Sequence, residues 1–126
     1  MNIFSLISTH KKIIKDIGFK QYFKYAFTKK HSLRKLIISG NSIYVRKGTP
    51  DILVAISSLN DEFESLRYLL PKNYNGLIID AGAYIGTASI TLSTMFPKAK
   101  IVAIEPSTEN LRILKKNLKN IKIRIY

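Results

Sequence analysis

The sequence predicts an α/β fold built around a parallel sheet. Two short apolar runs, residues 77–79 and 101–104, have the length of buried strands, and each is followed by a stretch with helical spacing. The first run leads through Asp80 into a stretch containing Gly82 and Gly86, which is typical of a tight turn between a strand and a helix. Because crossovers between parallel strands are right-handed, we expect a strand–helix–strand–helix–strand unit over residues 77–126.

Within this unit the first helix is expected over residues 87–96, with its buried side formed by Ala88, Ile90, Thr91, Leu92 and Met95. The second helix is expected to begin after Ser107, a suitable N-cap, with Glu109 in its first turn. The alternating residues 121–126 predict a third strand. The unbroken apolar runs of the first two strands predict that both faces of the sheet are covered. Three strands make about half of a doubly wound domain, so we expect an N-terminal portion of a longer protein, truncated after about three parallel strands.

Residues 1–35 form a basic segment with helical spacing, interrupted near Gly18. Its apolar positions are Ile13, Ile14, Ile17, Phe23, Ala26 and Phe27, and lysines lie between them. We expect one or two amphipathic helices that pack on the domain, with the lysine ammonium groups extended to water. The same pattern is also typical of a helix that binds a membrane surface or a partner.

Residues 36–76 predict a β-hairpin and two helices that flank the sheet. The hairpin strands are 36–38 and 43–45, joined by a turn over residues 39–42. A helix is expected after Thr49 as N-cap, with Pro50 and Asp51 in its first turn. A second helix is expected from Asn60, ending at Pro71; its inward positions are Phe63, Leu66, Leu69 and Leu70.

Composition limits the classes of function. The 126-residue chain carries a formal net charge of +13, from 21 Lys and Arg against 8 Asp and Glu. Such a surface attracts anions, although no basic run is dense enough for a nucleic-acid arm. The chain has no cysteine, and its two histidines, His10 and His31, are isolated, so we expect no metal site. No apolar run is long enough to span a bilayer and no signal peptide is evident, so we expect a cytoplasmic location.

The carboxyl ends of the two predicted strands carry the residues suited to a ligand. Asp80 and Glu105 follow neighbouring strands, and Gly82 allows a positive φ and a close backbone approach. A carboxylate at Glu105 could accept both ribose hydroxyls, Asp80 could bind an ammonium group, and the N–H groups of the turn would face the ligand. These roles together match S-adenosylmethionine. A dinucleotide matches less well, because the spacing of Gly82 and Gly86 departs from G-x-G-x-x-G.

Three motifs together resemble the opening half of the FkbM-type S-adenosylmethionine-dependent methyltransferases: Asp80-x-Gly82-Ala83-x-x-Gly86, Ile104-Glu105-Pro106 and Leu114-x-x-Asn117-Leu118. Upstream, Arg46-x-Gly48-Thr49-x-Asp51 resembles the flanking motif of the same family. The resemblance covers roughly residues 43–119. Tyr84 stands where the family usually has Asn.

The resemblance implies a Rossmann-like class I methyltransferase fold that methylates a hydroxyl oxygen on a sugar, glycan or other natural product. By the same resemblance Asp80, Gly82 and Gly86 would hold the methionine end of S-adenosylmethionine and Glu105 its ribose, with Ala83 and Pro106 completing the cofactor site. No general base can be assigned among the 126 residues. We therefore expect little or no methyltransferase activity from this chain alone, and no specific nucleic-acid partner.

A function of another class stays open. The segment from Phe19 to Lys30 interleaves lysines with aromatic rings, which also fits a basic module that binds anionic membrane or nucleic acid. A dehydrogenase half-domain is disfavoured by the missing middle glycine of the dinucleotide fingerprint and by Asp80, which would meet a pyrophosphate with negative charge.

Overall fold

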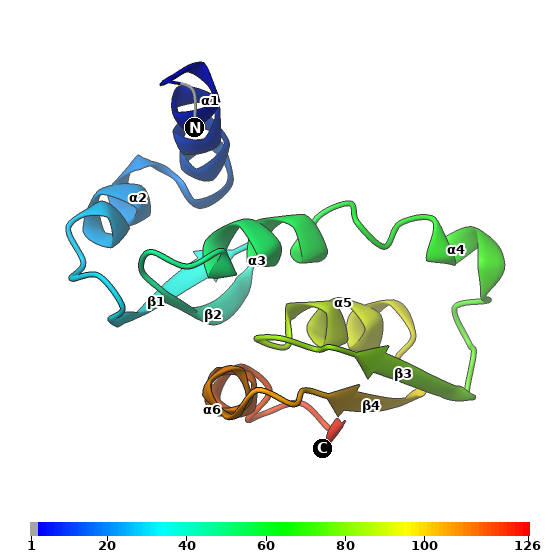
Figure 1. Ribbon diagram of the computed structural model, residues 1–126. Helices are drawn as coiled ribbons and strands as arrows, with labels where there is room; N and C mark the ends of the chain where they lie inside the picture. Colours follow the sequence, from blue (N-terminus) through cyan, green and yellow to red (C-terminus); the bar gives the residue numbers. More distant parts are fainter. Residues whose placement is uncertain (1–2) are drawn as a thin grey trace. The chain divides into compact units, whose positions relative to one another are not determined.

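The computed structural model describes residues 3–126 (Figure 1). The chain divides into two compact units, of which the first ends at Ile56 and the second is Ser57–Tyr126. The boundary between the units falls within one helix, α3 (Asp51–Leu59). The sequence predicts segment boundaries elsewhere, after residues 35 and 76. No helix among the described residues has both the length and the apolar character that crossing a membrane requires.

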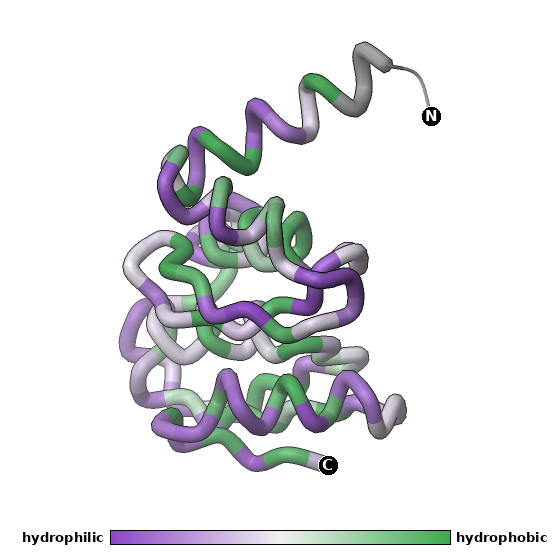
Figure 2. Tube along the Cα trace, turned by 90° about the vertical axis from the view of Figure 1, so that its left-hand side faces the viewer, coloured by the Kyte–Doolittle hydropathy of each residue, from purple (hydrophilic) through white to green (hydrophobic). Residues whose placement is uncertain are grey.

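The first unit begins with two helices, α1 (Ile3–Ile17) and α2 (Phe19–Ala26). Gly18 separates them with a φ of 77°, a conformation that glycine adopts without steric cost. The predicted break near this residue is therefore confirmed. Figure 2 shows apolar and hydrophilic residues alternating along these helices, as expected for elements that bury only one stripe.

A hairpin of β1 (Leu33–Ile38) and β2 (Asn41–Arg46) follows, and it too confirms the prediction. Ile38 pairs with Asn41, so the loop is only the two residues Ser39 and Gly40, both with positive φ (48° and 77°). This is the hairpin turn whose twist matches that of the strands. The buried hydrophobic residues described in this unit come from α1, α2, both strands and α3, namely Ile13, Ile17, Tyr25, Leu36, Ile38, Ile43, Val45, Ile52, Ala55 and Ile56.

One prediction for this unit is wrong. Phe23 and Phe27 were expected on the packed face of the helices, but their side chains are 51% and 77% exposed. The face that packs instead carries Tyr25, which is buried, and Gln21, whose side-chain amide exchanges two hydrogen bonds with the backbone of Ile37 (2.7 and 3.2 Å). Helical spacing alone does not determine which side of α2 is buried. In the structure the side that carries Tyr25 and Gln21 packs on the hairpin.

Residues 60–65 form turns rather than the start of the long helix predicted from Asn60. Between Asn60 and Pro71 only α4 (Leu66–Leu69) is helical, and it is preceded by hydrogen bonds between residues three apart, such as Glu64 N–H to Asp61 O at 3.2 Å. Helical turns closed by such bonds seldom continue for more than three or four residues, so no long helix forms here. Phe63, Leu66 and Leu70 still pack against a core cluster of Leu92, Met95, Phe96 and Ile101. Leu69, predicted to face inward, is 73% exposed.

The parallel sheet is confirmed. Its strands β3 (Leu77–Ala81), β4 (Lys100–Ile104) and β5 (Arg124–Ile125) lie in that order, joined by α5 (Thr87–Met95) and α6 (Thr108–Asn117). Figure 1 shows α5 lying along β3 and β4. The third strand is shorter than predicted, with two residues in the ladder against β4. Ser107 caps α6 as expected, since its Oγ accepts a hydrogen bond from the Asn110 N–H.

Only one face of this sheet is buried, so the expectation of cover on both faces is wrong for the described chain. Ile78 and Ile101 pair across the strands; Ile101 belongs to the core cluster and Ile78 packs against it. On the opposite face Leu77, Ile79 and Ile104 are 54%, 56% and 40% exposed. The physical reason is topological: two right-handed crossovers that step in the same direction place both of their helices on the same side of a sheet.

Candidate functional site

The site predicted from the sequence lies at the carboxyl edge of β3 and β4. The backbone after β3 takes a left-handed conformation three times, at Gly82 (φ 79°), Tyr84 (φ 52°) and Gly86 (φ 87°). The Gly82 and Ala83 N–H groups both donate to the carbonyl oxygen of Ile104, each at 2.9 Å. These two amides hold the turn against the end of β4, so they do not face a ligand as the sequence led us to expect.

Asp80 is the penultimate residue of β3 and pairs in register with Ala103 of β4. Its side chain points toward α5, where the Ser89 hydroxyl donates a 2.6 Å hydrogen bond to Asp80 Oδ2. The carboxylate is half-buried, while Ser89 is fully buried. Oδ1 makes no hydrogen bond to any residue that the structure describes, so one oxygen is left to accept from a ligand.

The two glycines of the turn serve different purposes. A Cβ placed on Gly82 would meet no atom within 4 Å, so the backbone there is open to an approaching molecule. A Cβ on Gly86 would come within 3.1 Å of the Leu118 side chain and 3.3 Å of that of Leu114. Gly86 is buried beneath α6, and this close packing accounts for the glycine without a ligand. Its predicted contact with a cofactor stays a prediction, as does that of Ala83, which is 4% exposed.

Glu105 follows β4 and is 7% exposed. Its Oε2 accepts the Tyr84 N–H at 2.8 Å, and its Oε1 accepts the Ser107 N–H at 2.8 Å and the Asn110 side-chain amide at 3.3 Å. One carboxylate therefore joins the turn after β3 to the start of α6. Pro106, beside it, is exposed. A ribose bound at Glu105 would have to share Oε2 with the Tyr84 N–H or displace this N–H from it.

The Leu114-x-x-Asn117-Leu118 motif of α6 packs against the glycine turn. Leu114 and Leu118 are 0% and 3% exposed and contact Gly86, as described above. The side-chain amide of Asn117, itself buried, donates a 2.8 Å hydrogen bond to the Ile85 carbonyl oxygen. The third motif of the resemblance is thus a brace for the second crossover helix and the glycine turn.

The upstream motif forms a buried ion pair in the first unit. Arg46 donates three hydrogen bonds to Asp51: its backbone N–H and Nε reach Oδ2 at 2.8 and 2.9 Å, and its Nη2 reaches Oδ1 at 2.9 Å. The two side chains are 9% and 0% exposed. The Thr49 hydroxyl donates to Arg46 O and accepts the Asp51 N–H at 3.4 Å, in the N-terminal position that the sequence predicted for it. This bidentate pair ties the end of β2 to the start of α3.

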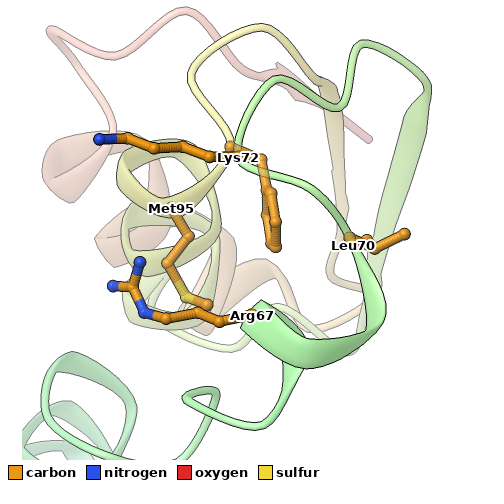
Figure 3. Close-up of a pocket in the computed structure, with 5 residues that line it drawn as sticks. Arg67, Leu70, Lys72 and Met95 are labelled. Atoms are coloured by element: carbon orange, nitrogen blue, oxygen red, sulfur yellow. The ribbon is translucent and has the colours of Figure 1, made fainter.

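A hollow elsewhere in the second unit does not involve the predicted site. It has a volume of about 70 Å³ and is lined by Arg67, Leu70, Lys72, Met95 and Phe96. Arg67 and Lys72 extend on either side of Met95 (Figure 3). Pockets for a drug-sized ligand enclose roughly 300–1,000 Å³, so this hollow is too small for a nucleoside. Among residues 3–126, no three His, Asp or Glu side chains come together as a metal site would require.

Sequence reasoning missed two polar residues that shape the site. Ser89 bonds to Asp80, and Asn110 bonds to Glu105. Helical spacing would have indicated Ser89, because it lies one turn before the apolar Leu92 on the same side of the helix. Asn110 is three residues after the N-cap Ser107, the position where a polar side chain can reach back to the preceding loop.

Comparison with known proteins assigns no family. No protein-family model matches the chain, and no curated protein matches it. Among solved structures, the chain is similar to one described as "a putative RNA methyltransferase PH1948 from Pyrococcus horikoshii", with 19% sequence identity and a TM-score of 0.45. The match covers 82% of this chain and 46% of that one, so the chain spans about half the length of that structure. At this identity and score the likeness does not assign a function.

Proposed function

We propose that the second unit is the S-adenosylmethionine-binding half of a methyltransferase that acts on a hydroxyl group of a sugar, glycan or other natural product. The observation that carries the proposal is the turn at Gly82. This residue has a left-handed conformation with open space around it, and it lies between two carboxylates, Asp80 and Glu105, that end neighbouring parallel strands. Ligands of open parallel sheets bind at this edge.

The residues fit the cofactor to different degrees. Asp80 has one carboxylate oxygen without a protein partner among the described residues, which suits the ammonium group of the methionine moiety. Gly82 leaves room for the methionine chain to pass over the backbone. Glu105 suits a ribose less directly, because both of its oxygens already accept N–H groups. Bound S-adenosylmethionine would supply an electrophilic methyl group on sulfur, which an acceptor hydroxyl can attack.

The acceptor class comes from the FkbM-type resemblance rather than from the site geometry. For the reaction, the chain must hold the cofactor so that the methyl group is in line with the attacking oxygen. Asp80 and the Gly82 turn would orient the methionine end. No described side chain is placed as the base for the hydroxyl, so cofactor binding rather than turnover is the direct test.

Titration calorimetry with S-adenosylhomocysteine provides that test. We expect saturable binding that is weakened about ten- to hundred-fold in Asp80→Asn, since a charge-assisted hydrogen bond contributes roughly 1.5–3 kcal/mol. Asp61→Asn is the matched control, because Asp61 is an exposed aspartate in the same unit, and its affinity should stay unchanged. Binding that is the same in wild type and Asp80→Asn, or binding of NADH in preference to S-adenosylhomocysteine, would overturn the proposal.

The other function expected from the sequence, a basic module that binds an anionic surface, is supported by a separate observation on α2. It concerns the first unit and does not exclude a cofactor site in the second.

A further inference from the structure

Helix α2 presents a row of three exposed phenylalanine rings. Phe19, Phe23 and Phe27 are 65%, 51% and 77% exposed, although large aromatic side chains are usually well buried. Their ring centroids are 5.8 Å apart for the first pair and 4.7 Å apart for the second. The three rings therefore touch one another along the helix and form one continuous apolar stripe, which we call the Phe stripe.

The opposite side of α2 is already occupied by its own unit. Tyr25 is buried with the Lys47 ammonium 4.2 Å from its ring centroid, and Gln21 is hydrogen-bonded to the backbone of β1. Tyr22 OH lies 2.8 Å from His10 Nδ1, which links α2 to α1. These contacts fix the rotation of the helix about its axis. The Phe stripe is therefore exposed because the opposite side of α2 is packed, and not because the helix is frayed.

A basic border runs beside the stripe. Residues advance by about 100° each around an α-helix, so Lys20 and Lys24 lie on the stripe adjacent to that of Phe19 and Phe23. Both lysines are exposed. The order around α2 is therefore apolar rings, then ammonium groups, then the face packed on the hairpin. This is the arrangement of a helix that lies in the plane of a membrane interface, with rings among the acyl chains and lysines at the headgroups.

We propose that the Phe stripe of α2, with Lys20 and Lys24, binds the surface of an anionic lipid bilayer. Lys20 and Lys24 attract anionic headgroups beside the stripe, and the whole chain carries a formal net charge of +13, which adds to this attraction. The proposal does not rest on the methyltransferase function. It assigns to the first unit a site that retains the protein at a membrane surface.

Single-stranded nucleic acid is the competing ligand for an aromatic and basic surface. It binds by stacking bases on ring faces that are separate and accessible. In α2 neighbouring rings are in contact and inclined to each other by 37° and 44°, which leaves no room for a base between them. The rings also offer no hydrogen-bonding group to a base edge. The geometry therefore favours an apolar medium over stacked bases.

Co-sedimentation of the full chain with vesicles tests the proposal. We expect binding to phosphatidylcholine vesicles containing 30% phosphatidylserine, at least about ten-fold weaker binding to pure phosphatidylcholine, and weaker binding in 0.5 M salt. The double variant Phe23→Ser/Phe27→Ser should lose at least about ten-fold in partitioning to the anionic vesicles. Leu69→Ser is the control, since Leu69 is an equally exposed apolar residue (73%) of the other unit, and it should bind as wild type does.

A spectroscopic variant gives a second readout. The chain contains no tryptophan, so Phe27→Trp introduces a single indole at the most exposed ring of the stripe. Its emission should shift to shorter wavelength on addition of anionic vesicles and stay unchanged with a single-stranded oligonucleotide. Far-UV circular dichroism verifies that each variant is folded. Absence of vesicle binding by wild type, binding that survives the double serine variant, or a tryptophan response to the oligonucleotide alone would each overturn the proposal.

Discussion

Replacing Glu105 by alanine removes a carboxylate that joins three parts of the second unit. The change leaves two backbone donors without their acceptor: the Tyr84 N–H of the glycine turn and the Ser107 N–H at the start of α6. Both are 2.8 Å bonds to a side chain that is 7% exposed. The third donor, the Asn110 amide at 3.3 Å, belongs to a side chain that can turn toward water, so it contributes little to the cost.

Each buried donor left without an acceptor costs about 1–3 kcal/mol, so the two backbone groups together cost about 2–6 kcal/mol. The lower half of this range is expected, because Pro106 and Thr108 are exposed and water can reach the neighbouring backbone once the carboxylate is gone. Glu105→Gln should cost less, since one side-chain oxygen still accepts.

Denaturant unfolding followed by far-UV circular dichroism measures the loss of stability, and amide hydrogen exchange locates it. Protection should fall at the Tyr84 and Ser107 amides in Glu105→Ala. Glu109→Ala is the control: it removes an exposed glutamate from the first turn of α6 and should change stability by less than about 1 kcal/mol. If Glu105→Ala leaves both the unfolding free energy and the protection of those two amides unchanged, the proposed role of this carboxylate in joining the turn to α6 is refuted.

Three further predictions concern the core of each unit. Asp51→Ala leaves the Arg46 guanidinium buried without its partner and should destabilise the first unit by about 3–5 kcal/mol, measured by denaturant unfolding; a change below 1 kcal/mol would contradict the buried pair. Ile101→Ala, at a 5% exposed position, should cost about 2–5 kcal/mol, whereas Ile79→Ala, at a 56% exposed position on the other face, should cost less than about 1 kcal/mol; equal costs would show that both faces are covered. Burial, aided by the nearby Asp51 charge, raises the pKa of Tyr25 above 10.0, so the unfolded state releases this proton first and stability should fall as pH rises beyond 10; Tyr25→Phe should flatten that fall, and an equally steep fall in the variant would contradict it.

Much of the site could be predicted because its parts are local in the sequence. An apolar strand followed by Asp80 and a glycine is sufficient to place the turn, since the left-handed φ of Gly82 is a property of that residue type. Ser107 as N-cap of α6 follows from the same kind of local chemistry. The break at Gly18 belongs to this group too, because it depends on one residue that tolerates positive φ, and so does the existence of the hairpin, although its turn is shorter than the predicted residues 39–42.

Tyr84 shows where local chemistry and the observed backbone disagree. Its φ of 52° is a conformation in which Asn is enriched and bulky residues are uncommon. In this chain the Tyr84 N–H bond to Glu105 helps to hold the tyrosine in that conformation.

Partners that are distant in the sequence could not be predicted. Glu105 lies 21 residues from Tyr84, and Asn117 lies 32 residues from Ile85, yet hydrogen bonds join both pairs. The sequence indicated Glu105 and Gly86 as ligand contacts, because a carboxylate or a glycine has the same local appearance whether it faces a ligand or a neighbouring helix. The packed structure adds the contacts with distant residues, which are the buried donors around Glu105 and the leucine side chains next to Gly86, while the ligand contacts of both stay predictions.

Residue type and spacing were sufficient for the α/β class, the order of strands and helices along the chain, and the position of the glycine turn, because each follows from interactions within a few residues. Which faces are covered was decided by the tertiary structure alone. The apolar run of β3 is the same whether one side or both are buried, and the two stripes of α2 are both plausible cores. Burial depends on which elements meet in space, and that choice exposes Ile79 on the sheet and the Phe stripe on the helix.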